Sequence, residues 1–250
     1  MGSSLLIIID VMRRVRSGKS FRALLPRILP LRGAGIAFMN VLNYGDKDAD
    51  IILLQPVDAH DLESMDREAD LIRELSGRAF RLLAFCVPNW NRDLSPWKAP
   101  AVFGKEDFGD GAAKTLAQIS DVCTDKTQTY FVGGYSLAGL FALWAVYQTD
   151  LFRGAAAASP SLWFPGFSDY MRAQKPMCSH IYLSLGDREE HTRSSVMASV
   201  GAKVREASAL LEEQQIDHIL EWNPGNHFKD NDLRTAKAFA WLIQRECRTI

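Results

Sequence analysis

The feature that most restricts the fold of this chain is the stretch FVGGYSLAGLFALW, Phe131 to Trp144, in which a strand-like run passes abruptly into a helix-like run. The apolar run stops at two glycines, and the residues after Ser136 have the spacing of a buried helix. So tight a turn strains the residue at its tip and needs small neighbours, which Gly134 and Ala138 provide. The stretch therefore predicts a serine held at the joint between a strand and a helix.

The same alternation runs through the rest of the chain. Short apolar runs are typical of buried strands, and the segments between them carry apolar residues at helical spacing. Repeated units of this kind predict an α/β fold, with a doubly wound, mostly parallel sheet and helices on both faces. A length of 250 residues favours a single domain over residues 1–250. The predicted strands are Leu5–Val11, Ile51–Leu54, Leu82–Val87, Thr129–Val132, Gly154–Ala158, Ile181–Leu185 and Ile216–Trp222.

Charge and composition exclude several classes of function. The net charge of −1 gives no electrostatic footprint for nucleic acid or for an anionic membrane. The apolar run Leu5–Ile9 is shorter than the roughly 7–15 residues of a signal core or the about 20 of a membrane-spanning helix. The four cysteines lack metal-ligand spacing and are interpreted as reduced core thiols, which favours a cytoplasmic protein. A homodimer is compatible with the sequence.

Ser136 has two interpretations. It could simply cap the helix that follows it. Alternatively it is a nucleophile, because sites in open α/β sheets form at the carboxyl ends of strands, where helix N-termini point. The chain order expected for such a site is a serine, then an acid after a later strand, then a histidine before the last helix. His227, in the turn NPGNHFKD before the final helix, completes that order and favours the nucleophile.

Four other histidines compete with His227 for the role of base. His180 and His218 fall at or inside predicted strands, where a structural role is expected. His191 lies near the acids but too early in the chain for this order. His60 follows an early strand and is expected to line the pocket, rather than to join Asp58 and Asp61 in a metal site.

The chain resembles an esterase branch of the α/β-hydrolases, a group that includes S-formylglutathione hydrolase-like enzymes and esterases that open siderophore trilactones. Four segments carry the resemblance and together span roughly Ile51 to the C-terminus: GGYSLAGLFALW, AAAASPSLWF, LSLGDREE and EWNPGNHF. Such enzymes often carry a serine–proline–serine–aromatic run like Ser159 to Trp163. The resemblance implies a small-molecule ester substrate, with no cofactor and no metal.

Three acids, Asp187, Glu189 and Glu190, follow the strand Ile181–Leu185. The resemblance implies a Gly-x-x-acid spacing and a glutamate, which select Glu189 after Gly186. A glutamate also reaches farther than an aspartate, as a residue three places beyond the strand end must. Asp187 could instead accept hydrogen bonds from backbone N–H groups in the turn, and Glu190 is expected in a solvated ion pair. Glu189 is preferred, with Asp187 and Glu190 kept as alternatives.

The oxyanion that forms during acyl transfer needs backbone donors. The N–H of Leu137 is the natural first donor, because it opens the helix after Ser136. The second is expected in the loop after Ile51–Leu54, where Pro56 has no N–H. Val57 is the preferred donor there, and Asp58 is the alternative.

Two segments are expected to wall the pocket, namely the long loop Pro88–Gly111 and the stretch Ser161–Met171. Each carries tryptophans that either line the pocket or pack the loops: Trp90, Trp97 and Trp163.

Taken together, these patterns predict a serine esterase in which Ser136 forms an acyl-enzyme, His227 is the general base and Glu189 orients the histidine. Three other functions remain open. An acyltransferase would use the same residues and exclude water, and a peptidase would need room for a chain on both sides of the bond. A non-catalytic binding module on a hydrolase scaffold would need no intact order of serine, acid and histidine.

Overall fold

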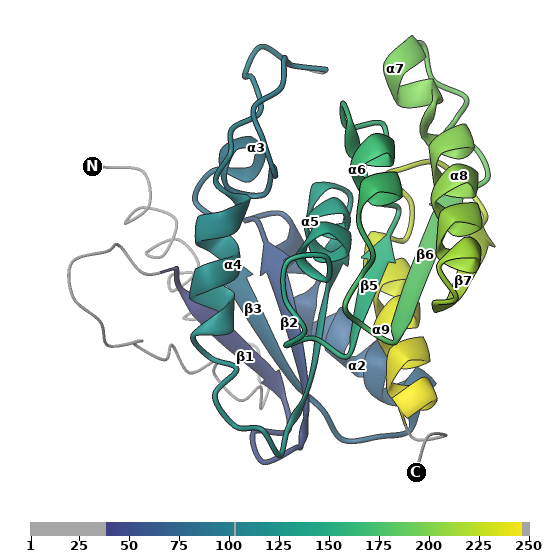
Figure 1. Ribbon diagram of the computed structural model, residues 1–250. Coiled ribbons are helices and arrows are strands. Elements are labelled where there is room, and N and C mark those ends of the chain that lie inside the picture. The colour runs from purple at the N-terminus through teal and green to yellow at the C-terminus, as the bar shows by residue number, and fades with distance from the viewer. Residues whose placement is uncertain (1–38, 103, 247–250) are drawn as a thin grey trace, which may run out of the picture.

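The computed structural model describes residues 39–102 and 104–246, and the strand expected at Leu5–Val11 lies outside them. Seven strands form one sheet in the order β1-β3-β2-β4-β5-β6-β7 (Figure 1). β1 pairs with β3 in antiparallel register, and all other neighbours are parallel. The predicted α/β fold with a mostly parallel sheet is therefore confirmed. The strands are β1 Val41–Gly45, β2 Ile51–Val57, β3 Arg81–Cys86, β4 Thr129–Tyr135, β5 Gly154–Ala158, β6 His180–Gly186 and β7 Asp217–Asn223.

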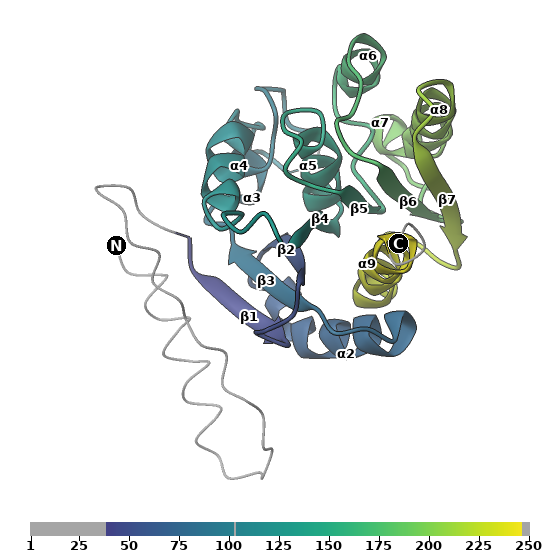
Figure 2. The same ribbon diagram turned by 60° about the horizontal axis from the view of Figure 1, so that its bottom comes forward.

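Helices cover both faces of the sheet. α2 and α9 pack together on one face, while α4, α5, α6 and α8 lie on the other (Figure 2). Three short helices, α3, α6 and α7, lie in the connections that follow β3, β5 and β6, at the same end of the sheet (Figure 1). The helices are η1 Asp61–Glu63, α2 Met65–Ser76, α3 Trp90–Asp93, α4 Ala112–Ser120, α5 Leu137–Ala145, α6 Phe167–Ala173, α7 Ser195–Ala198, α8 Val200–Glu213 and α9 Asn231–Glu246.

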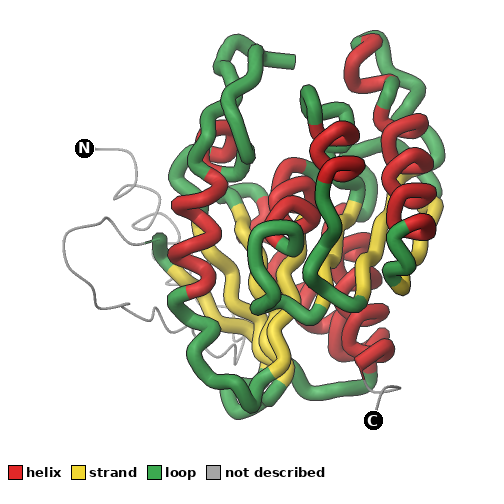
Figure 3. The backbone as a smooth tube through the Cα atoms, in the orientation of Figure 1, coloured by secondary structure: helices red, strands yellow, loops and turns green. Residues whose placement is uncertain are grey.

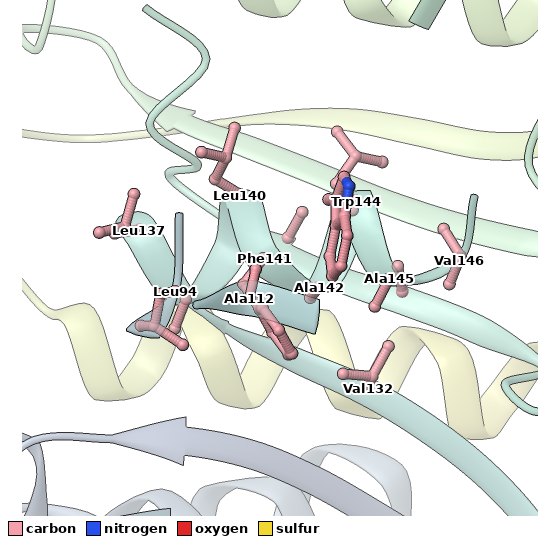
Figure 4. Packing of buried hydrophobic residues seen from close by; sticks show 14 of the residues in the cluster. Leu94, Ala112, Val132, Leu137, Leu140, Phe141, Ala142, Trp144, Ala145 and Val146 are labelled. Atoms are coloured by element: carbon pink, nitrogen blue, oxygen red, sulfur yellow. The ribbon is translucent and has the colours of Figure 1, made fainter. Parts of the chain in front are cut away.

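The sheet separates two apolar cores, and α5 lies at the centre of the larger one. Every residue of α5 is buried, as expected for a helix without a polar face. Leu137, Phe141 and Trp144 pack among Leu94 of the α3 region and residues of α4 and β4 (Figure 4). Burial of this kind contributes roughly 1.5–3 kcal/mol for each large side chain, so α5 anchors the turn that precedes it.

β2 runs farther than its sequence predicts, because Pro56 does not end it. The carbonyl of Asp50 accepts a hydrogen bond from the first residue of β4, Thr129. The carbonyl of Val57 accepts one from Val87, the residue after β3. Backbone groups of even-numbered residues in β2 therefore face β4, and the pairing with β4 stops at Leu54. Pro56 lacks its N–H only on the side where no strand pairs with it, which is where a strand tolerates proline.

Most connections at one end of the sheet are short loops, whereas the opposite end carries the longer connections that follow the parallel strands (Figure 3). The segment Pro88–Gly111 is one of these, and it contains the single-turn helix α3 within what its sequence predicts to be loop. The segment after the β6 loop forms two helices, α7 and α8, which are separated at Ser199. None of the helices in the described part of the chain is long and apolar enough to span a bilayer.

Candidate active site

Ser136 occupies the turn between β4 and α5. Its backbone has φ of 58° and ψ of −118°, a conformation that residues other than glycine rarely adopt. Strain of this kind costs about 1–3 kcal/mol and persists only where surrounding contacts enforce it. A Cβ on Gly134 would lie 2.5 Å from the Cβ of Ala138, so the glycine leaves the room that the alanine occupies. The side chain of Ala138 therefore fits into the turn beside Gly134.

Three side chains from different loops form a continuous hydrogen-bonded series at this turn. The Nε2 atom of His227 lies 3.0 Å from the Oγ atom of Ser136. The Nδ1 atom of the same ring lies 2.7 Å from Oε2 of Glu189. Because the carboxylate can only accept, Nδ1 carries the proton and Nε2 is free to accept from the serine hydroxyl. The structure thus brings together Ser136, His227 and Glu189, the residues that the sequence singles out.

Several hydrogen-bond donors surround the carboxylate of Glu189, whose side chain is only 2% exposed. Its Oε1 atom accepts hydrogen bonds from the Gly186 N–H at 2.7 Å and from the Ser159 hydroxyl at 2.8 Å. Burial raises the pKa of the carboxyl, but the hydrogen bonds from His227, Gly186 and Ser159 and the charge of His227 outweigh burial and lower the pKa below its ordinary value. Glu189 is therefore charged at neutral pH.

A buried arginine completes this set. Arg234, on α9 and 1% exposed, donates from Nη1 to Oε1 of Glu189 at 2.7 Å. The same guanidinium donates from Nη2 to the carbonyls of Pro224 and Asn226, which lie in the turn that carries His227. Arg234 therefore ties the acid and the histidine turn to one helix.

The histidine turn is also attached to β4. The Tyr135 hydroxyl donates to the His227 carbonyl at 2.8 Å and accepts from Nη1 of Arg234 at 3.0 Å. Burial raises the pKa of Tyr135 to about 12, so the hydroxyl keeps its proton and can donate. The residue directly before Ser136 thus fixes the backbone of His227.

The other candidate acids have different partners. Asp187 is exposed, and its Oδ1 atom accepts a hydrogen bond from the Gly225 N–H at 2.8 Å. It thus binds a backbone N–H, as the sequence allows for an aspartate in a turn. Glu190 pairs with Arg205 of α8 at 3.1 Å. Neither carboxylate contacts His227 in the described structure.

The other histidines lie apart from this series. His180 is buried in β6 with Nδ1 2.9 Å from Oδ2 of Asp217, and His218 in β7 lies against Ser208. His191 is exposed and lines the cavity beside Ser136. His60 is exposed in the loop after β2 and is not among the residues that line that cavity.

The two expected oxyanion donors differ in their geometry. Leu137 is the first residue of α5, so its N–H has no acceptor within the helix. Val57 is paired with Cys86 in the parallel ladder, and its carbonyl accepts from the Val87 N–H. In such a ladder the N–H and C=O of one residue face the same neighbour, so the Val57 N–H points to β3 and not toward Ser136.

The geometry therefore argues against Val57 as the second donor. The reason is that β2 extends through Pro56 instead of ending before it, so that Val57 is still part of the strand. Odd-numbered residues of β2 face β3, and the Val57 N–H faces it too. The alternative, Asp58, uses its N–H to donate to Oδ2 of Asp61 at 3.2 Å.

A cavity of about 670 Å³ opens beside Ser136 and His227. Of the three tryptophans, Trp90 and Trp163 line it. Trp97 does not, since its ring packs against Phe164, Phe167 and Tyr170 and its Nε1 donates to the Pro165 carbonyl. The two predicted walls are thus both present, with the Trp97 ring used for packing.

Within residues 39–102 and 104–246, no three histidine, cysteine, aspartate or glutamate side chains are placed to hold a metal ion. Cys86, Cys123 and Cys178 are free thiols, and burial raises the pKa of each.

No family model and no curated protein sequence matches this chain. Its structure is similar to an IroE-like serine hydrolase from Shewanella oneidensis, with a TM-score of 0.66 and 15% identity over 82% of this chain and 76% of that one. It is also similar to the siderophore hydrolase EstA from Aspergillus nidulans, with a TM-score of 0.60 and 16% identity over 92% of this chain and 99% of that one.

The enterobactin esterase from Shigella flexneri shares a TM-score of 0.59 and 13% identity, and the match covers 83% of this chain but 56% of the esterase. At such identities the likeness concerns the fold. Together with the sheet order and the strained serine turn, these likenesses define an α/β-hydrolase fold, the class that the sequence predicts.

Sequence reasoning missed the residues that surround the acid. Arg234 stands four residues before Ala238 and eight before Leu242, both of which are buried. A charged residue on the same helix face as buried apolar residues was therefore the signal available in the sequence. Ser159 lies in the serine–proline–serine run, and its φ of 41° marks a second strained turn at the end of β5. No pattern in the sequence indicates that these two side chains meet at Glu189.

Proposed function

We propose that this protein is a serine esterase that cleaves carboxylic esters of small molecules through an acyl-enzyme on Ser136. The observation that carries the proposal is the hydrogen-bonded series from Ser136 through His227 to Glu189, at a strained strand–helix turn beside an open cavity. The fold adds support, because it is shared with solved structures described as serine hydrolases and esterases.

In the proposed mechanism the Ser136 hydroxyl attacks the ester carbonyl while Nε2 of His227 accepts its proton. The imidazolium then returns that proton to the leaving alcohol, and the acyl group remains on Ser136 through an ester bond. A water molecule then attacks the acyl carbon while His227 accepts its proton. The bond to Ser136 breaks, the imidazolium returns the proton to the serine oxygen, and the acid is released. The Leu137 N–H, at the positive end of α5, stabilises the negative oxygen that forms in each step.

Glu189 stabilises the imidazolium and holds the ring in the tautomer that can accept from Ser136. Its charge is the property that matters, and Arg234, Ser159 and Gly186 all favour the charged form. We assign Arg234 as a positioning residue, because it touches Glu189 and the His227 turn but not Ser136.

Hydrolysis fits the site better than acyl transfer, because the His227 side chain is 26% exposed and water can reach it. A binding module would have no need of a buried carboxylate kept charged behind a histidine. A peptidase would share the chemistry, and its test is an amide substrate offered beside the ester.

The proposal is tested by hydrolysis of p-nitrophenyl esters of graded chain length, with Ser136→Ala compared against Ser161→Ala. The Oγ atoms of these two serines are 3.3 Å apart, so the pair shows which hydroxyl reacts. We expect Ser136→Ala to lose on the order of 10⁶ in kcat, whereas Ser161→Ala, whose hydroxyl is not bonded to His227, should lose far less. Activity of Ser136→Ala within tenfold of the native protein would refute the assignment.

A further inference from the structure

Two kinds of side chain line the cavity beside Ser136. The first kind is apolar or aromatic and comprises Trp90, Trp163, Met197, Val200 and Phe228. The second kind is cationic and comprises Arg188 and Arg193, both from the loop after β6. Since the chain as a whole has a net charge of −1, these lining cations are a local feature and do not follow from composition.

Both arginines are exposed and form no side-chain hydrogen bond or ion pair in the part of the chain that the structure describes. Arg188 also lines an adjoining recess of about 260 Å³, together with Lys229, whose ammonium is equally without a partner among the described residues. Three cationic side chains therefore line the cavity or its adjoining recess.

The acids of the same region have other partners. Glu189 is held by His227 and Arg234, and Glu190 by Arg205. Asp187 accepts from the Gly225 N–H and lines the recess, not the cavity. Among the described residues that line the cavity and the recess, the three cations therefore outnumber Asp187, the lining acid that has no cationic partner.

We propose that the site prefers esters that carry an anionic oxygen group, a carboxylate or a phosphate, attached to an apolar body. The inference rests on the proposed esterase function and specifies its substrate class. The apolar body lies against the apolar and aromatic lining residues, and the anionic group meets Arg188 and Arg193, with Lys229 near the recess. Because guanidinium groups bind both kinds of anion, carboxylate and phosphate esters form separate arms of the test.

The test compares kcat/KM for matched pairs of esters. On the acyl side, p-nitrophenyl half-esters of four- to seven-carbon dicarboxylic acids are paired with the neutral p-nitrophenyl esters of equal length. On the alcohol side, 4-carboxyphenyl and 4-phosphonooxyphenyl butyrate are paired with phenyl butyrate. We expect at least one anionic series to exceed its neutral partner by about 5–50-fold at low salt, and the advantage to shrink at 0.5 M NaCl because the arginines are exposed.

The double variant Arg188→Gln/Arg193→Gln should lose most of this preference, and Arg188→Glu/Arg193→Glu should reverse it. The matched control is Arg78→Gln, an exposed arginine just before β3 at the opposite end of the sheet, which should keep the native ratio.

Failure of the inference is distinguishable from failure of the esterase proposal. If neutral esters are cleaved by the native protein but not by Ser136→Ala, and no anionic series is preferred, the substrate class is wrong and the esterase stands. If the preference survives in the double variant, the assignment to the two arginines is overturned. If no ester is cleaved and a fluorophosphonate does not label Ser136, both proposals are refuted.

Discussion

Glu189 and Asp61 are two carboxylates at the same edge of the sheet with opposite electrostatic surroundings. Glu189 lies after β6, where burial raises its pKa but the hydrogen bonds from His227, Gly186 and Ser159 and the charge of His227 lower it by more. Asp61 lies after β2, where burial and the neighbouring Asp58 carboxylate raise its pKa to about 6. In the described part of the chain no arginine or lysine pairs with Asp61, although the Asp58 N–H donates to it.

The opposite pKa shifts of these two carboxyl groups show what a buried carboxyl at this edge of the sheet needs in order to stay charged. A buried carboxyl stays charged only where cations and N–H donors replace the water it has lost. Arg234 makes the loop after β6 such a place, and the loop after β2 has no equivalent. This explains why the β6 side of Ser136 can supply the charge behind His227.

The largest effect should come from removing that charge. We expect Glu189→Gln to lower kcat for ester hydrolysis by on the order of 10⁴, because the histidine loses both its charge partner and its preferred tautomer. Asp187→Asn and Glu190→Gln, assayed at the same pH, are the matched controls and should remain near the native rate. Collapse of Asp187→Asn alone would make Asp187 the acid and break the comparison.

Removing the cation should make Glu189 behave more like Asp61. We expect Arg234→Gln to lower kcat by roughly 10²-fold, less than loss of the acid itself, because the carboxylate remains but its pKa rises. The ratio of native to variant rates should therefore be largest near pH 5 and shrink toward pH 8, where the carboxyl ionises again. Arg234→Lys should restore part of the rate.

A purely structural role for Arg234 predicts a different result. The rate loss would then be the same at every pH, and it would follow the fraction of protein that unfolds in urea. Since a buried pair that loses one partner can cost about 3–5 kcal/mol, the lysine variant keeps the test usable if the glutamine variant is poorly folded.

The smallest effect concerns Asp61 and is measured as the pH dependence of the free energy of unfolding. Because the folded pKa of Asp61 is about 6 against an ordinary value of 3.8, the folded state binds more protons than the unfolded chain between these values. Its contribution is present below about pH 4 and is lost as the pH rises toward 6.

Asp61→Asn should accordingly flatten part of the fall in unfolding free energy between pH 4 and pH 6, by at most about 3 kcal/mol and by less where water screens the loop. Glu68, whose pKa burial also raises, will keep some of the slope. Urea denaturation at several pH values checks this. A variant with an unchanged slope would show that Asp61 is ionised in the folded protein.

The sequence predicts much of the fold and of the serine turn because both depend on local patterns. The two glycines and the apolar helix after Ser136 specify a strand–turn–helix unit whatever lies around it. The order of Ser136, Glu189 and His227 follows from the order of strands in a parallel sheet, where every carboxyl end reaches the same edge.

What the sequence could not supply depends on contacts between distant elements. The direction of the Val57 N–H follows from the hydrogen-bond parity of β2, which is set by its two neighbouring strands. Arg234 meets Glu189 only because α9 packs against β6, although the two residues are 45 positions apart in the chain. The short antiparallel strand β1 has little signal of its own and forms because it covers the edge of β3.

The most direct test of the central claim, that Ser136 is a nucleophile activated by His227, is the mass of the protein after reaction with a fluorophosphonate. The account predicts one covalent adduct, located on the peptide that contains Ser136, with none in Ser136→Ala. Labelling of His227→Ala should be slower by at least about 10²-fold, since the serine loses its base. An adduct on Ser161, no adduct on the native protein, or equally fast labelling without His227 would contradict it.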